Sequence, residues 1–141
     1  MNKKFYLQVF IALLFTVSGL QAQTLLPKPE PPRAVNDFAG LLSASEVQSL
    51  ENKLRTFTDT TSNAIVIVIV DDLQGYDISE FAFKIGNDWG VGHSGFKNGV
   101  VVLMKTKTAE SGGRIFIAPG YGLEGAIPDL TCDDIIQKEI L

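Results

Sequence analysis

The sequence predicts an α/β fold: a three-layer α/β/α sandwich with a mixed, mostly parallel central sheet of about four strands and helices on both faces. Residues 64–70 and 100–104 are apolar at successive positions, which is typical of strands covered on both sides. Residues 78–89, between them, repeat apolar side chains at helical spacing. A strand, a helix and a strand in this order predict a βαβ crossover, so we expect the two strands to be parallel.

A capping box marks the start of the first helix. In residues 43–46, Ser43 can accept a hydrogen bond from the Glu46 backbone while the Glu46 side chain reaches back. The helix then runs to about residue 58, with an apolar stripe of Val47, Leu50, Leu54 and Phe57. Its other face is expected to be solvated and carries Gln48, Glu51, Asn52 and Arg55.

The later elements follow from similar patterns. Residues 77–80 form a second capping box, and the helix behind it ends at Gly90. Residues 114–118 are predicted to be a strand that forms a hairpin with 100–104. A last helix, capped by Asp129 or Thr131, continues to the end of the sequence without a stop signal, so we expect its closing part to be missing. The stripes of the last two helices are Ile78, Ala82, Ile85 and Trp89, and Cys132, Ile135, Ile136 and Ile140.

Three parts of the chain differ in composition. Residues 1–22 resemble a signal peptide, with a basic start, an apolar stretch over 5–17 and a small residue, Ala22, before the expected cut. Residues 23–32 hold four of the six prolines and are predicted to be a Pro-rich linker. Residues 33–141 are the domain. We therefore expect an exported protein, periplasmic or secreted, with an uncleaved membrane anchor as the alternative.

The charge balance is acidic. The chain has 12 basic and 16 acidic residues, and two of the basic ones, Lys3 and Lys4, lie in the predicted leader. Such a domain, without a Lys/Arg cluster, is a poor candidate for binding nucleic acid. Cys132 is the only cysteine, so no intrachain disulfide can form, and its apolar surroundings predict a buried, unreactive thiol.

A glycine-rich loop over 119–129 follows the strand at 114–118. It contains three glycines, Glu124 and Asp129, and glycine allows the backbone to approach a ligand or another backbone closely. Its Gly-x-Gly-x-x-Gly spacing matches a dinucleotide fingerprint, but Pro128 separates the last glycine from the helix and Glu124 would repel a pyrophosphate. We expect no nucleotide at this loop.

Four oxygen-bearing side chains are the candidate metal ligands. Carboxylate, amide and carbonyl oxygens suit a hard cation, Ca²⁺ first and Mg²⁺ second, whereas one cysteine and one histidine are too few for zinc. Each ligand has a structural alternative: an Asx-turn, a turn before a strand, or a helix cap. Glu124 is the hardest to explain structurally. The candidates are Asp37, Asn98, Glu124 and Asp129.

Other polar residues are expected to be bystanders. His93 lies in a glycine-rich stretch and is predicted to be solvent-exposed. Asp71 and Asp72 follow a strand, where open α/β sheets place ligands, but we interpret them as solvated turn residues. Asp88 is expected on the polar face of its helix.

Four blocks of sequence together resemble the TPM domain family. They cover nearly all of the chain after residue 33, and the resemblance implies an α/β/α sandwich on the membrane-distal side of an envelope or thylakoid membrane. Relatives with reported calcium binding and acid phosphatase activity imply those functions as expectations. The blocks are Val35–Leu42, Gly86–Gly92, Lys97–Leu103, and Gly120–Glu124 with Asp129.

The sequence leaves three hypotheses open. The first is an exported module that binds a divalent cation and acts in interaction or quality control with an envelope or membrane protein complex. The second is a metal-assisted acid phosphatase in which Asp37 or Asp129 activates water, although Lys97 is the only nearby basic residue. The third is a structural partner-binding domain without metal. We expect a monomer in each case.

Overall fold

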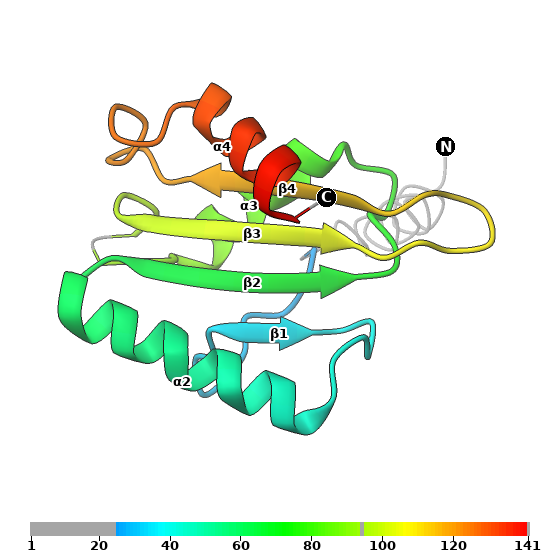
Figure 1. Cartoon of the computed structure of the whole chain (residues 1–141), viewed down its shortest axis with the longest axis horizontal. Helices are drawn as coiled ribbons and strands as arrows, with labels where there is room; N and C mark the ends of the chain where they lie inside the picture. The colour runs from blue at the N-terminus through cyan, green and yellow to red at the C-terminus, as the bar shows by residue number, and fades with distance from the viewer. Residues whose placement is uncertain (1–24, 94, 141) are drawn as a thin grey trace, which may run out of the picture.

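The computed structural model describes residues 25–93 and 95–140, which form one mixed sheet with helices around it (Figure 1). The strand order is β1-β2-β3-β4; the first three strands are parallel, and β4 is antiparallel to β3. The predicted βαβ unit and hairpin are therefore confirmed. The elements are β1 Val35–Asp37, α2 Ala44–Thr61, β2 Ala64–Val70, α3 Ile78–Trp89, β3 Gly99–Lys105, β4 Arg114–Pro119, α4 Asp129–Ile135 and a π-helical turn, η2 Ile136–Ile140.

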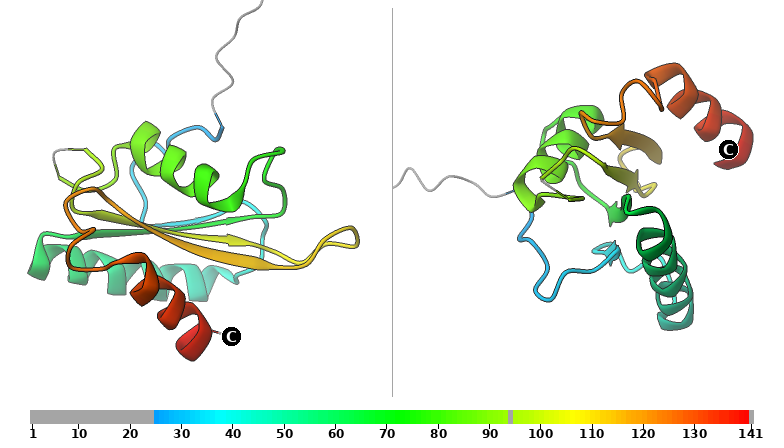
Figure 2. Two further views of the ribbon diagram at one scale, coloured as in Figure 1. Left: turned by 90° about the horizontal axis from the view of Figure 1, so that it is seen from above. Right: turned by 90° about the vertical axis from the view of Figure 1, so that its left-hand side faces the viewer.

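The elements lie in three layers, as predicted. Helix α3 covers one face of the sheet, and α2 and α4 lie on the other, at its two sides (Figure 2). Since successive side chains of a strand point to opposite faces, each strand contributes to two separate packing surfaces. On β3, the side chains that face α3 are more completely buried than those on the face that carries α2 and α4.

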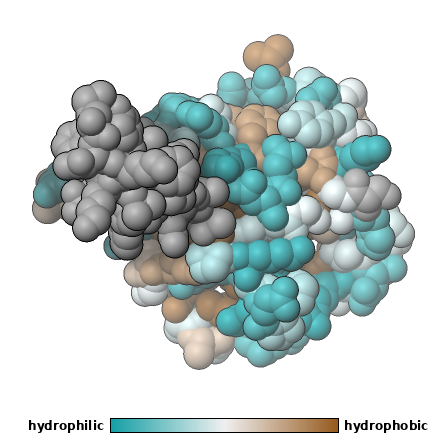
Figure 3. All heavy atoms as spheres, turned by 180° about the vertical axis from the view of Figure 1, so that it is seen from behind, coloured by the Kyte–Doolittle hydropathy of each residue, from teal (hydrophilic) through white to brown (hydrophobic). Residues whose placement is uncertain are grey.

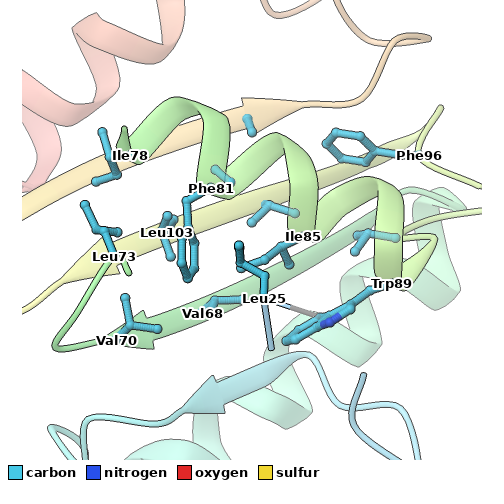
Figure 4. Close-up of a cluster of buried hydrophobic side chains, with 14 residues drawn as sticks. Leu25, Val68, Val70, Leu73, Ile78, Phe81, Ile85, Trp89, Phe96 and Leu103 are labelled. Carbon is cyan, nitrogen blue, oxygen red and sulfur yellow. The ribbon is translucent and has the colours of Figure 1, made fainter. Parts of the chain in front are cut away.

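The main core lies between α3 and the sheet. Phe81 and Ile85 of α3 point toward Val68 and Leu103, and all four are fully buried (Figure 4). Leu25, at the start of the described chain, is buried against the same cluster. The segment predicted as a linker, residues 23–32, therefore contributes Leu25 to the core.

Two hydrogen bonds hold this N-terminal segment in place. The Trp89 indole Nε1–H donates to the Leu26 carbonyl at 3.1 Å, and the Gln74 amide donates to the Leu25 carbonyl at 2.8 Å. Trp89 was expected in the buried stripe of its helix and is buried. Its indole N–H also ties the Pro-rich segment to the domain.

Helix α2 begins at the predicted capping box and ends later than expected. The Ser43 side chain accepts from the Glu46 backbone at 3.3 Å, and the Glu46 carboxylate accepts from the Ser43 backbone at 2.8 Å. The helix continues to Thr61, where Ser62 adopts a left-handed conformation (φ 61°) and closes it. The prediction that Glu51 is solvated is wrong, because Glu51 is only 7% exposed.

Glu51 binds the outer edge of the sheet. Its two carboxylate oxygens accept hydrogen bonds from the backbone N–H groups of Ala34 (3.0 Å) and Val35 (2.9 Å), and Arg55 Nε donates to it at 3.2 Å. Burial alone raises the pKa of Glu51, but the backbone donors and Arg55 outweigh it and lower the pKa below its ordinary value of 4.5. A helix carboxylate thus takes donors that an edge strand would otherwise leave unpaired.

Helix α4 packs on the other face over a smaller cluster. Cys132 and Ile136 are buried against Val100 of β3 and Ile117 of β4. The buried thiol was predicted; burial and nearby carboxylates raise the pKa of Cys132, so it stays protonated. The predicted cap at Asp129 or Thr131 is wrong: Pro128 occupies the cap position without a side-chain hydrogen bond, and Asp129 is the first helical residue.

The glycine-rich loop after β4 is anchored to the segment before β3. Backbone N–H groups of Gly120, Tyr121 and Gly122 donate to the carbonyls of Gly99, Phe96 and Lys97 at 2.7, 3.1 and 2.8 Å. A Cβ at position 120 would lie 2.8–2.9 Å from three of these carbonyl oxygens, whereas one at Gly125 would meet nothing within 4 Å. The glycines at 120 and 122 therefore allow two backbones to meet, and no ligand is needed to explain them.

Glu51→Gln should destabilise the domain at neutral pH. An amide oxygen can accept from one β1 donor, but its NH₂ group faces the other, which costs about 1–3 kcal/mol of the free energy of unfolding. Because the folded-state pKa is lowered, the carboxylate's contribution is complete above about pH 4.5 and is lost as the pH falls through the folded pKa. Urea denaturation at pH 7 and pH 3 should show a gap between wild type and variant that shrinks at low pH.

Asp59→Asn is the matched control for this substitution, since Asp59 is an exposed acid on the same helix. It should leave the unfolding curve nearly unchanged at both pH values. A gap for Glu51→Gln that stays constant between pH 7 and pH 3 would contradict the role given to the carboxylate.

Gly120→Ala should destabilise the domain much more than Gly125→Ala. The added methyl group at position 120 meets backbone oxygens that cannot rotate away, and overpacking of this kind costs about 1–3 kcal/mol. Position 125 has open space, so alanine there should be tolerated. Thermal unfolding of the two variants measures the difference, and equal melting temperatures would show that the loop contact is unimportant.

Candidate functional site

The structure does not bring the four predicted ligands to one point. Asp37, at the end of β1, is level with Ile69 of β2, whereas Gly99, which follows Asn98, is level with Ala64. Five residues of extended strand separate these levels, which is roughly 16 Å. Because ligands lie about 2.3–2.6 Å from a calcium ion, Asp37 and Asn98 cannot bind the same one.

Asn98 is occupied by structural hydrogen bonds. Its Oδ1 accepts from the His93 backbone N–H at 2.7 Å, and its Nδ2 donates to the Ser62 carbonyl at 2.6 Å. The side chain therefore joins the end of α2, the glycine-rich loop after α3 and the start of β3. The turn interpretation, given as the alternative for this residue, accounts for these contacts.

Asp37 stabilises the connection from β1 to α2. Its Oδ2 accepts from the Leu42 backbone N–H at 2.7 Å, which closes the intervening turn. Its Oδ1 is buried and has no hydrogen-bond partner among the described residues. This oxygen lies at the opposite end of the sheet from the glycine-rich loop, so it contributes nothing to a site there.

Glu124 and Asp129 are the two predicted ligands that share a loop. Both side chains are exposed, and neither forms a hydrogen bond or ion pair with another described residue. Asp129 and Asp133 are four residues apart on α4 and therefore lie on one side of this helix. Over residues 25–93 and 95–140, no group of three or more His, Cys, Asp or Glu side chains is arranged to hold a metal ion.

The predicted bystanders behave as expected. His93 is exposed, with Nδ1 lying 3.1 Å from the Ser62 carbonyl oxygen. Asp71 and Asp72 are exposed, and Asp72 accepts from the Gln74 backbone in a turn. Asp88 forms a surface ion pair with Lys84 at 3.1 Å.

A feature that was not predicted is an incompletely covered strip of the sheet between α2 and α4, here called the α2–α4 groove. Its floor, here called the α2–α4 groove floor, consists of apolar strand residues that remain half-buried: Ile65, Ile67, Val102, Met104 and Ile115. In Figure 1, neither helix crosses this part of β2 and β3. On the other face of β3, Val101 and Leu103 are 0% exposed.

A cavity lies at the end of the α2–α4 groove where β3 ends. It has a volume of about 440 Å³ and is lined by residues that include Leu41, Met104, Ile136 and Gln137. Leu41 is 55% exposed, and Phe57 of α2 is 38% exposed. Seen from behind, the molecule shows mostly hydrophilic side chains with hydrophobic patches between them (Figure 3).

The position of Phe57 follows from the helix geometry of α2. Glu51, Arg55 and Asp59 line a different cavity on the β1 side of this helix. Leu50 and Phe57 are seven residues apart and lie on the flank of α2 that faces away from that cavity. One sequence signal could have indicated an incompletely covered face. The strands are apolar on both faces, and the chain has few helices to cover them.

No helix among the described residues is both long and apolar enough to cross a membrane. The predicted signal peptide, residues 1–22, lies outside the described residues.

Comparison with known proteins agrees with the fold. The structure is similar to the solution NMR structure of the N-terminal domain of a protein from P. gingivalis, with a TM-score of 0.66 and 28% sequence identity. The match covers 77% of this chain and 67% of that chain. Among curated proteins, none matches.

The sequence profile of the TPM domain matches residues 35–141. This range contains all four strands, the helices α2, α3 and α4, and the glycine-rich loop. It also contains the four sequence blocks that suggested the resemblance. The chain belongs to the TPM domain family.

Proposed function

We propose that this TPM domain is an exported protein-interaction module of the cell envelope and that the α2–α4 groove holds its partner. The observation that carries the proposal is the unequal closure of β3: Val101 and Leu103 are fully buried under α3, while Val102 and Met104 remain half-buried on the other face. Contiguous apolar surface that is incompletely buried favours an interaction site.

Burial of the groove floor by a partner would be favourable. Each Å² of apolar surface removed from water contributes about 25 cal/mol, and the floor offers five aliphatic side chains in one place. Leu41 and Phe57 extend the apolar surface beyond the floor. The groove can thus bind a partner without any change in the main core under α3.

A photo-crosslinking residue at position 104 should form covalent adducts with envelope proteins, and the same residue at position 80 should not. Met104 lies in the groove floor, whereas Glu80 is exposed on α3, on the other face. Mass spectrometry of crosslinked envelope extract identifies the adducts. Absence of adducts from position 104, or the same adducts from both positions, would reject the groove as the binding surface.

Competition separates groove binding from non-specific capture. Unlabelled wild-type domain should suppress the adducts from position 104, and a Val102→Thr/Met104→Gln variant should suppress them less. Both residues are half-buried, so these near-isosteric changes should leave the domain folded, which a thermal melt checks. Equal suppression by a folded variant would also contradict the proposal.

A second candidate function is weak binding of a divalent cation at the glycine-rich loop. Glu124 and Asp129 are free of other described partners, and the first half of the loop is fixed by its hydrogen bonds to 96–99. Ca²⁺ fits carboxylate and carbonyl oxygens from such a loop better than Mg²⁺ does, because it accepts flexible geometry. Two carboxylates provide little charge, which favours low affinity.

Isothermal titration calorimetry should detect Ca²⁺ binding with a Kd of about 10⁻⁴–10⁻³ M, the range of weak extracellular sites. Combined Glu124→Gln and Asp129→Asn substitutions should abolish the binding, since they remove both charges. Asp37→Asn is the control and should leave it intact, because Asp37 lies at the other end of the sheet. Loss of binding in Asp37→Asn alone would move the site away from the loop.

A further inference from the structure

We infer that the first part of β2 binds an extended segment of another polypeptide as an added strand, and that this segment carries an acidic side chain. The site is an edge of the sheet, whereas the α2–α4 groove lies on a face, so the inference goes beyond the proposed function. Strand β1 is three residues long and pairs only with residues 67–69 of β2 (Figure 1). Among the described residues, no strand pairs with residues 64–66 on this side, here called the β2 edge site.

The backbone of Ile65 is directed toward this open side. The Ile67 N–H donates to the Ala34 carbonyl of the β1 segment at 2.7 Å. The Ile69 carbonyl accepts from the Phe38 N–H at 2.9 Å. Because backbone groups of a strand alternate between its two sides, Ile65 directs both its N–H and its carbonyl the same way as Ile67 and Ile69. Within the described residues, neither group of Ile65 forms a hydrogen bond.

Two features of the β1 segment leave this edge open. If the ladder continued regularly, the Ala34 N–H would donate to the Ile65 carbonyl. It donates instead to Glu51 Oε1 at 3.0 Å. Pro31 and Pro32 come next toward the N-terminus, and proline has a fixed φ and no N–H, which disfavours a longer strand.

A cavity of about 420 Å³ lies beside the β2 edge site, on the β1 side of α2. Residues 64–66 of β2, Thr58 of α2 and Trp89 of α3 all contribute to its lining. Because successive side chains of a strand point to opposite faces, a lining by three successive residues means that the cavity reaches around the edge of β2. Three residues of a strand span about 10 Å, so the site accommodates a short extended segment.

An extended polypeptide matches the free backbone groups. Ile65 presents one donor and one acceptor on the same edge, and an extended chain carries the complementary pair. In an antiparallel arrangement, one residue of the added segment exchanges both hydrogen bonds with Ile65. The interior of a helix cannot do so, because its backbone groups are already paired with each other. Strand addition at a sheet edge is a recurring mode of peptide binding.

The charges around the cavity favour an acidic residue in the added segment. Glu51 and Arg55 offset each other, since Arg55 Nε donates to Glu51 at 3.2 Å. Lys28 and Arg33 remain, both exposed, and neither forms an ion pair within the described residues. Asp59 is the one acid left beside them, so positive charge is in excess. The charged and titratable lining residues are Lys28, Arg33, Glu51, Arg55, Asp59 and His93.

A capped seven-residue peptide of alternating threonine and valine with a central glutamate tests the inference. One version carries N-methyl groups on its three central residues, and a matched version carries three at its ends. Central methylation removes the donors that pair with the Ile65 carbonyl, so fluorescence anisotropy should show roughly threefold to tenfold weaker binding of that version. Equal affinity of the two versions, or no binding by the unmethylated peptide, would overturn the inference.

Hydrogen exchange measured by NMR locates the peptide. The Ile65 amide should exchange about tenfold more slowly when nine-tenths of the domain is bound, since exchange then occurs from the free fraction. The Ile67 amide is the internal control and should change little, because it already donates to Ala34. Unchanged exchange at Ile65 under saturating peptide would contradict strand addition.

Charge reversal tests the acidic residue. Lys28→Glu with Arg33→Glu should weaken binding of the unmethylated peptide by about twofold to fivefold for each ion pair lost. The control, Lys53→Glu with Lys97→Glu, changes the net charge equally at exposed positions that do not line the cavity. It should keep most of the affinity, and equal effects of the two double variants would reject the acidic partner.

A groove variant separates this site from the proposed function. Val102→Thr/Met104→Gln changes the groove floor and leaves residues 64–66 unchanged, so it should bind the peptide as the wild type does. Failure of the peptide experiments then overturns the β2 edge site alone, and failure of crosslinking at position 104 overturns the groove alone. Loss of peptide binding in the groove variant would contradict the placement of the peptide at the edge.

Discussion

The structure depends on one constraint: its two central strands are apolar on both faces, so both faces must be kept from water. Helix α3 meets this requirement on its side, where Val68, Val101 and Leu103 are completely buried. On the other side α2 and α4 lie apart and leave the middle of β2 and β3 half-buried. Most of the stability follows from the first face, and the proposed function follows from the second.

The ends of the sheet are held by contacts between backbones and by single polar side chains. Glu51 takes donors from the edge of β1, Asp37 closes the turn into α2, and Asn98 joins three segments at the start of β3. Gly120 and Gly122 allow the loop after β4 to meet the loop before β3. These residues belong to the scaffold, which explains several motif positions without a ligand.

The strands, helices and hairpin could be predicted because each has a local cause in the sequence. Apolar runs, helical spacing and the Ser43 capping box act over a few residues, and they predicted the order of elements correctly. Glu51 could not be predicted in this way. Its spacing puts it among polar neighbours on α2, and only the packing of β1 beside that helix reveals two donors for its carboxylate.

The candidate site was less predictable because it depends on strand register. Asp37, the last residue of β1, and Asn98, just before β3, both lie at strand ends, but parallel pairing places them at opposite ends of the sheet. The sequence pattern places acidic and amide residues near strand ends, but it does not tell at which end of the folded sheet each residue lies. The groove could not be predicted for a related reason. An apolar stripe shows which side of a helix is buried, but it does not give the distance between two helices on one face of a sheet.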